Sequence, residues 1–159
     1  MKKMLFTLLL TVMCQLGFAQ SATAVFNDFK SEKKAEYVHI SKAMMAFASG
    51  QLPVHGMSGL MNKLNSASTL SLNHCRKSVR RKFAARIDKL AGDGYEEYVR
   101  FREGRKDILM MVKPEGDYLS EVVVLVTDEN DCLAVLGKGR LEKSDLEKIA
   151  GEIKDEEEE

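Results

Sequence analysis

The sequence has few of the residues from which catalytic and metal sites are built. Its three histidines, His39, His55 and His74, never stand four residues apart, the spacing that places two imidazoles on one side of a helix. No glycine-rich phosphate loop and no Gly-x-Ser-x-Gly motif occurs. His74 precedes Cys75, but adjacent residues on a helix or strand point apart, so this is no nucleophile and base pair. We therefore expect no catalytic residues, no cofactor and no metal ion.

The chain also lacks an apolar run of transmembrane length, since residues 4–13 fall short of the roughly 20 residues that a spanning helix needs. This run follows two lysines and precedes small residues, as in a cleavable secretory signal. The sequence predicts a signal peptide over 1–19, a mature chain beginning at Gln20, and export to the periplasm or envelope. The alternative is a lipoprotein anchored through Cys14, although Met13 stands where such signals favour a small residue.

The mature chain has neither a large net charge nor many cysteines. Cleavage leaves 140 of 159 residues, with 22 of the 24 basic residues against 24 acidic ones, so a nucleic-acid partner is not expected. This length suits one domain over 20–154, followed by an acidic, disordered tail over 155–159. Cys75 and Cys132 either form one disulfide or are small buried residues.

The first half of the mature chain predicts short elements. A polar lead-in over 21–27 precedes a strand over 36–41, which runs into a helix over 42–47. A helical turn or two over 58–64 and a second short strand over 69–72 follow.

The second half predicts a long helix and then a β-meander. Residues 75–90 place Val79, Phe83 and Ile87 on one side of a helix, with Asn73 as its N-cap. Four strands joined by short turns follow, at 96–103, 106–113, 119–127 and 132–140. Such short connections make the strands antiparallel neighbours, and a helix over 144–153 completes an α+β fold.

One strand of this meander is apolar on both faces. Residues 122–126 are all apolar, which predicts a central strand that is covered on each side. The two long helices, 75–90 and 144–153, are expected to cover only one face. An early helix, a ligand or a partner subunit would then cover the other.

Several of these segments resemble the domain-of-unknown-function family 4252 of exported Bacteroidetes proteins. The resemblance rests on residues 37–44, 95–104, 121–126 and 137–141. It implies export and a single domain, and no activity or site residues. Members of the family often carry a lipoprotein cysteine, for which Cys14 is the only candidate.

The predicted helix over 75–90 is strongly basic, with a single acid, Asp88. Its basic residues are Arg76, Lys77, Arg80, Arg81, Lys82, Arg86 and Lys89. Clustered positive charge suits an acidic protein, anionic lipid or a polyanionic glycan. The alternative is a solvated helix face whose charges pair within the protein.

A second candidate lies on the first strand of the meander. Tyr98, Arg100 and Arg102 alternate along it and are expected on one face, where they would suit an anionic or glycan ligand. The alternative is cross-strand pairing with acids such as Glu121.

These features predict an exported, non-catalytic interaction module that uses its basic helix to bind an envelope protein or an anionic surface. One alternative is a small-ligand or lipid-binding protein that uses the sheet face at Tyr98. A second alternative is a hydrolase.

Overall fold

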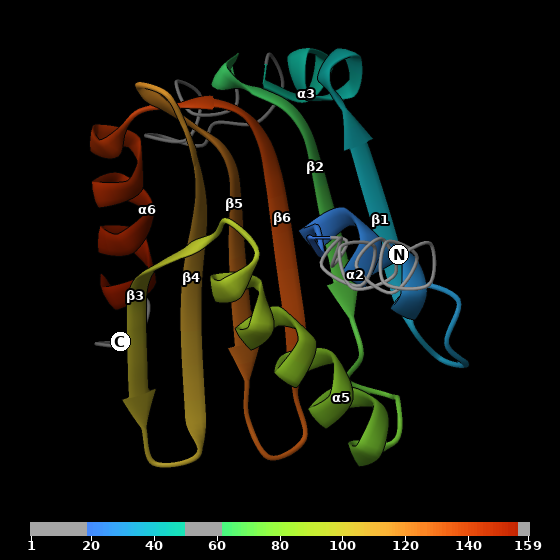
Figure 1. Cartoon of the computed structure of the whole chain (residues 1–159). Coiled ribbons are helices and arrows are strands. Elements are labelled where there is room, and N and C mark those ends of the chain that lie inside the picture. Colours follow the sequence, from blue (N-terminus) through green and yellow to red (C-terminus); the bar gives the residue numbers. More distant parts are fainter. Residues whose placement is uncertain (1–18, 50–61, 156–159) are drawn as a thin grey trace, which may run out of the picture.

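A computed structural model describes residues 19–49 and 62–155, which build a six-stranded antiparallel sheet in the order β1-β2-β6-β5-β4-β3 (Figure 1). The strands are β1 (Glu36–Ser41), β2 (Leu64–Ser71), β3 (Glu96–Glu103), β4 (Lys106–Glu115), β5 (Tyr118–Thr127) and β6 (Cys132–Leu141). Residues 1–18 of the predicted signal peptide, most of the predicted helical turn at 58–64 and residues 156–159 of the predicted tail lie outside the described residues.

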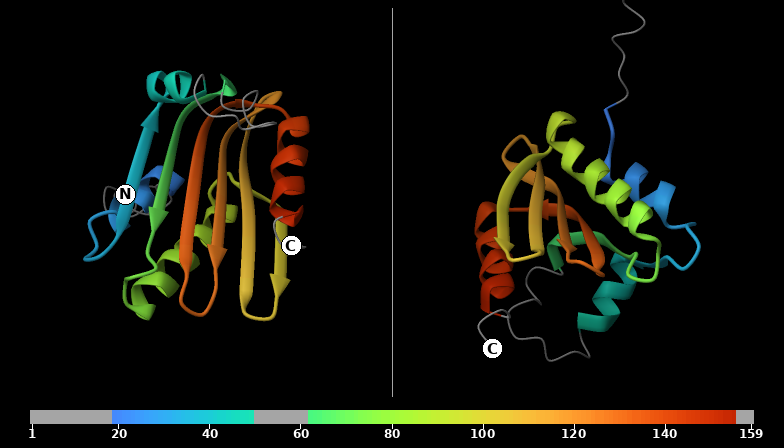
Figure 2. Two further views of the ribbon diagram at one scale, coloured as in Figure 1. Left: turned by 180° about the vertical axis from the view of Figure 1, so that it is seen from behind. Right: turned by 90° about the horizontal axis from the view of Figure 1, so that it is seen from below.

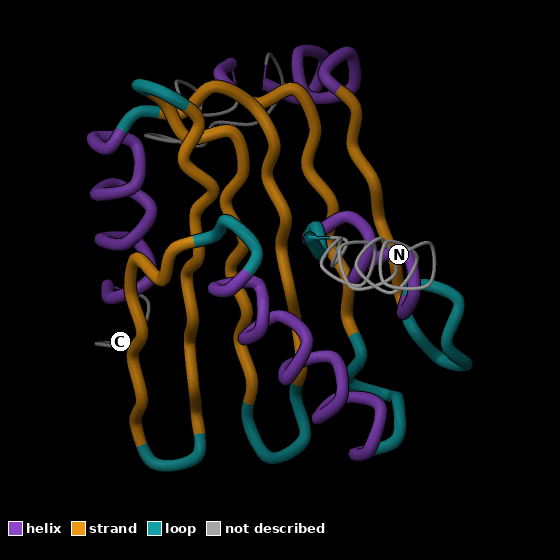
Figure 3. Tube along the Cα trace, in the orientation of Figure 1, coloured by secondary structure: helices purple, strands orange, loops and turns teal. Residues whose placement is uncertain are grey.

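The predicted α+β fold and its C-terminal meander of four strands are confirmed (Figure 3). Gly104 and Gly116 stand in the turns after β3 and β4 with φ of 58° and 61°, a conformation that strains other residues. The second strand is longer than predicted, because β2 already begins at Leu64. It lies between β1 and β6, so the first two strands extend the meander at its β6 edge.

Helices lie on both faces of the sheet (Figure 2). Helices α2 (Ala22–Phe29) and α5 (Lys77–Asp88) share one face, called here the α5 face. Helices α6 (Lys143–Asp155) and α3 (Lys42–Ser49) lie on the other, the α6 face. The expectation that the two long helices share a face is wrong, because α2 fills the α5 face beside α5.

Each face has its own apolar core. On the α5 face, Phe83 is fully buried, and its ring meets those of Phe26 and Phe29 edge-on, with centroids 5.8 and 5.2 Å apart. The smaller cluster under α6 consists of Met110, Val112, Leu119, Val122, Leu141 and Leu146. Strand β5 places Val123 in the first core and Val122 in the second, which confirms its predicted burial on both faces.

The predicted polar lead-in over 21–27 is wrong, because these residues belong to helix α2. Ser21 is its N-cap, and its Oγ accepts a hydrogen bond from the Ala24 N–H at 3.1 Å. The buried side chains share one side of the helix, namely Ala22, Val25, Phe26 and Phe29. Thr23, Asn27 and Asp28 stand at other positions of the helix and gave the segment its polar character.

Asn73 is not the N-cap of the basic helix. Its Oδ1 accepts a hydrogen bond from the Cys132 N–H at 2.8 Å and so holds the start of β6. Helix α5 begins at Lys77, and its N-cap, Arg76, makes no capping bond through its side chain. A 3-10 turn, Lys89–Gly92, continues the helix beyond Asp88.

The two cysteines are free and buried. Cys75 donates a hydrogen bond from Sγ to the Lys33 carbonyl at 3.5 Å. Burial raises the pKa of Cys132 to about 12, so its thiol stays protonated. The structure therefore agrees with the second alternative from the sequence: Cys75 and Cys132 are small buried residues and form no disulfide.

None of the helices in the described part of the chain has the length and apolar character needed to cross a membrane.

Candidate interaction surface on helix α5

The seven basic residues of the predicted site divide into two groups, and the first builds the fold. Arg80 donates from Nη1 to the carbonyls of Asn73, at 3.2 Å, and Asn130. Its Nη2 donates to the Glu129 carbonyl at 3.3 Å. Arg80 therefore joins α5 to the turn between β5 and β6 through hydrogen bonds.

Arg86 belongs to the same group. Its Nη1 lies 2.7 Å from Asp28 Oδ2, and its guanidinium stacks over the ring of Phe29, 5.6 Å from the centroid. Both partners lie on α2, so Arg86 joins the two helices of the α5 face.

The second group faces solvent. Within the described chain, these side chains make no ion pair and no hydrogen bond, and all are exposed: Arg76, Lys77, Arg81, Lys82 and Lys89. We call this group the outer cations. Asp88, the one acid of α5, is bound by Arg100 and does not neutralise them.

A cavity of about 550 Å³ lies between α5 and the turns of two hairpins. Lys77 and Arg81 line it from the helix, and Arg105 lines it from the β3–β4 turn. Its acidic side chains come from the β5–β6 turn, where Glu129 pairs with Arg105. Asp128 and Asp131 also line the cavity, so Lys77 and Arg81 share it with carboxylates of the β5–β6 turn.

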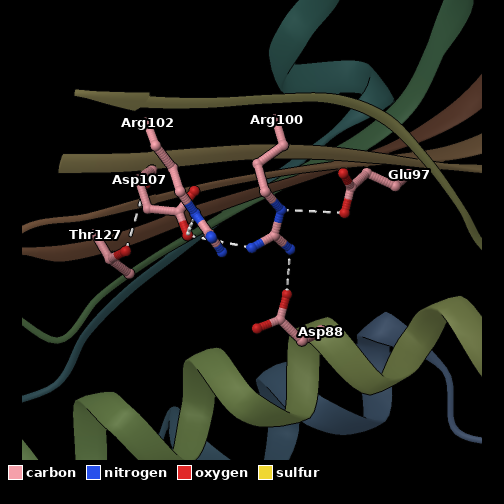
Figure 4. Close-up of polar contacts among 6 residues, drawn as sticks. All are labelled: Asp88, Glu97, Arg100, Arg102, Asp107 and Thr127. Atoms are coloured by element: carbon pink, nitrogen blue, oxygen red, sulfur yellow. Dashed lines mark hydrogen bonds and ion pairs between the residues drawn. The ribbon is translucent and has the colours of Figure 1, made fainter.

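The second predicted site is not an open ligand face. Arg100 and Arg102 share the α5 face as predicted, but both are bound to carboxylates (Figure 4). Arg100 pairs with Asp88 of α5, with Asp107 at 3.2 Å and with Glu97 at 3.1 Å. The hydrogen bond to Asp88 is the largest cause of the raised pKa of Arg100. The predicted partner, Glu121, pairs instead with Lys138, at 3.6 Å.

Tyr98 is separated from these arginines by a β-bulge. The register of β3 against β4 shifts between Glu97 and Val99, so Tyr98 falls on the α6 face. There it lines a cavity of about 370 Å³ together with Val112, Tyr118 and Leu146. The predicted stripe of three residues is therefore wrong, because one extra residue in the strand turns Tyr98 to the opposite side.

Sequence reasoning missed a polar link in the α5 core. The Tyr95 hydroxyl donates to Glu121 Oε2 at 2.6 Å and accepts from the Ala22 N–H at 2.9 Å. Burial and the Glu121 carboxylate raise the pKa of Tyr95, so the hydroxyl keeps its proton. These two hydrogen bonds join the first turn of α2 to β5. They connect residues that are far apart in the sequence, so no local pattern predicts them.

A serine and a histidine also meet in the sheet. His39 Nδ1 lies 2.9 Å from Ser68 Oγ, which also accepts from the Tyr37 hydroxyl at 3.3 Å. His39 and Ser68 stand opposite each other in the register of β1 and β2, so this contact joins the two strands. Within 19–49 and 62–155, no three His, Cys, Asp or Glu residues lie where they could hold a metal ion.

The described chain is thus an α+β protein with one antiparallel sheet, helices on both faces and a strongly basic helix α5. It belongs to the family described as a domain of unknown function (DUF4252), whose sequence model matches residues 29–149. No curated protein and no solved structure matches the chain.

Proposed function

We propose that this chain is an exported, non-catalytic interaction module that binds an anionic partner through the outer cations of α5. The observation that carries the proposal is the division of the basic residues. Arg80 and Arg86 bind groups within the protein, whereas the outer cations make no ion pair within the described chain. A positive surface that the fold does not neutralise attracts an anionic partner at short range, even in salt.

The test is in-cell crosslinking of the tagged full-length chain in its host, followed by mass spectrometry of the envelope. The variant carries Lys77→Glu, Arg81→Glu and Lys82→Glu, which leave Arg80 and Arg86 in place. Glutamate at position 77 suits the positive end of the helix dipole, so the variant is expected to fold. A partner captured by the wild type and lost by this variant supports the proposal.

The matched control carries three charge reversals elsewhere, Lys33→Glu, Lys42→Glu and Lys148→Glu. These lysines are also exposed, so the change in net charge is the same. Equal loss of the partner in both variants contradicts a role for α5, because it reflects net charge alone.

Export is tested separately by the mass of the protein recovered from the envelope. A chain that begins at Gln20 supports cleavage of the predicted signal. A diacylated chain that begins at Cys14 supports the lipoprotein alternative, and a chain that keeps residues 1–19 contradicts both.

The cavity beside Tyr98 favours a second candidate function, the binding of a small ligand. Its lining includes apolar side chains, such as Val112 and Leu146, and the two tyrosines Tyr98 and Tyr118. Native mass spectrometry of protein purified from its host tests this candidate. A bound molecule that is lost from Tyr98→Ala and kept by Lys77→Glu supports it.

A further inference from the structure

The register of the sheet places three rows of side chains across all six strands on the α6 face. The central row comprises Val38, Thr69, Val135, Val124, Met110 and Val99. The rows on either side begin at Ile40 and at Glu36 and end at Glu96 and Phe101. Only Glu36 and Glu96 carry charge in these rows, and both lie on edge strands. The face is therefore uncharged across its middle, where Thr69 and Ser71 are its polar members.

Helix α6 covers only part of this face. Met110, in β4, is 1% exposed beneath it, whereas Val135 in β6 and Val38 in β1 are 36% and 56% exposed. Figure 2 shows α6 over the β3–β4 side of the sheet, and no described helix lies over the middle of β1, β2 and β6. The residues of this open patch are Val38, Ile40, Thr69, Leu133 and Val135.

The exposed large apolar side chains of the described chain all lie on this side of the sheet. Val38, Val135, Phe101 and Tyr98 belong to the α6 face itself. The other two belong to α3, on the same side, where Met44 is 59% and Phe47 is 73% exposed. Apolar exposure gathered on one face marks an interaction surface.

We propose that the open patch is the interface at which a second copy of this chain stacks, sheet against sheet. In a two-fold symmetric pair, each side chain near the axis meets its own counterpart, so the surface must be compatible with itself. The open patch meets this condition because its side chains carry no charge. The α5 face does not, because its outer cations would repel their counterparts.

The area of the open patch determines how tightly two copies of the chain are expected to associate. Strands about 4.8 Å apart, rising about 3.4 Å per residue, give an open area of about 340 Å² over the three strands and seven residues. A symmetric stack that also includes Met44 and Phe47 buries about 800 Å² in total, the size of a weak and transient interface. We therefore expect a reversible dimer that dissociates on dilution.

The test is sedimentation equilibrium of the protein purified from its host, from about 1 μM to about 1 mM, a range that brackets weak association. Val135→Lys places like charges near the axis and is expected to raise the dimer Kd more than about 100-fold. The control, Ala85→Lys, adds the same charge on the exposed side of α5 and is expected to leave the Kd unchanged.

The outcomes separate the possible occupants of the patch. A wild-type monomer throughout this range overturns the proposal, and a monomer that carries an apolar molecule in native mass spectrometry assigns the patch to that ligand. A dimer that survives Val135→Lys overturns it too, because the interface then lies elsewhere. If Val135→Lys loses its near-ultraviolet circular dichroism, Val38→Lys decides instead, since Val38 is the more exposed position.

Discussion

The two faces of the sheet differ in how the chain covers them. On the α5 face, two helices bury a large aromatic core and turn charged residues outward. On the α6 face, one long helix covers the β4 side and leaves apolar residues open toward β1. The two faces therefore expose different kinds of side chain. The α5 face stabilises the molecule and offers charge, whereas the open part of the α6 face offers apolar surface that contributes little to the isolated chain.

The largest effect that separates the two faces is expected from Phe83→Ala. It removes a fully buried ring that packs against Phe26 and Phe29, so it lowers the free energy of unfolding by about 3–5 kcal/mol. Val38→Ala, in the open patch, is expected to cost less than about 0.5 kcal/mol in the monomer. Urea unfolding at low protein concentration measures both, and similar losses would contradict the difference in cover.

Tyr95→Phe is expected to have the next largest effect. It removes the hydroxyl that joins the Ala22 N–H to Glu121 and leaves a buried carboxylate short of a donor, at a cost of about 1–3 kcal/mol. Tyr98→Phe is the control, because the Tyr98 hydroxyl has no partner in the described chain. Hydrogen exchange is expected to show faster opening of α2 in Tyr95→Phe alone. Unchanged exchange there would contradict the anchoring role.

On the α6 face, Asp145 is expected to make stability depend on pH. Burial opposes its ionisation, but the Glu142 N–H, at 2.8 Å, and the Lys63 ammonium, at 2.9 Å, outweigh it and hold the pKa of Asp145 below its ordinary 3.8. The folded state thus binds the proton less readily than the unfolded state. The stabilisation is present above the ordinary pKa and is lost as pH falls through the lowered one.

Asp145→Ala tests this at the start of α6, where the carboxylate accepts a hydrogen bond from the N–H of Glu142, the residue before the helix. The cost is about 1 kcal/mol at pH 7, as for other capping bonds. It is expected to shrink below pH 4, in urea unfolding measured at several pH values. A cost that stays constant with pH would contradict the lowered pKa.

The smallest difference in stability is expected between two variants of neighbouring residues in α5. Arg80→Met removes three bonds to backbone carbonyls and is expected to cost about 1 kcal/mol, whereas Arg81→Met costs nothing measurable. Thermal unfolding of the two variants side by side provides the measurement. Equal melting temperatures would contradict the division of the basic residues into two groups.

Local patterns predicted the meander well. Its strands are joined by short turns at residues such as Gly104 and Gly116, so neighbouring segments determine the pairing. The position of β2 between β1 and β6 could not be predicted in the same way, because β2 and β6 are far apart in the sequence. The bulge before Val99 is a single extra residue that no periodicity reveals, and it moved Tyr98 to the other face.

For the basic helix, too, the sequence could not predict the contacts of single residues. Its charge was evident from the sequence, but Arg80 and Arg81 are adjacent and chemically identical. Only the fold brings the carbonyl of Asn130 to Arg80 and leaves Arg81 in solvent. The sequence could therefore predict a basic surface, and not which of its members are free to act.

The place of β2 in the sheet also sets an order of folding. A chain that emerges amino-terminus first presents β1 and β2 long before β6, the last strand, which completes the pairing of β2. The bond from Cys132 to Asn73 spans 59 residues, and the bond from Ala22 to Tyr95 spans 73. Until Leu141 has emerged, β2 is an unpaired edge beside an incomplete core, a state that is prone to aggregation. Productive folding of this protein is thus expected to be a late event, close to the completion of the chain and slow for its length.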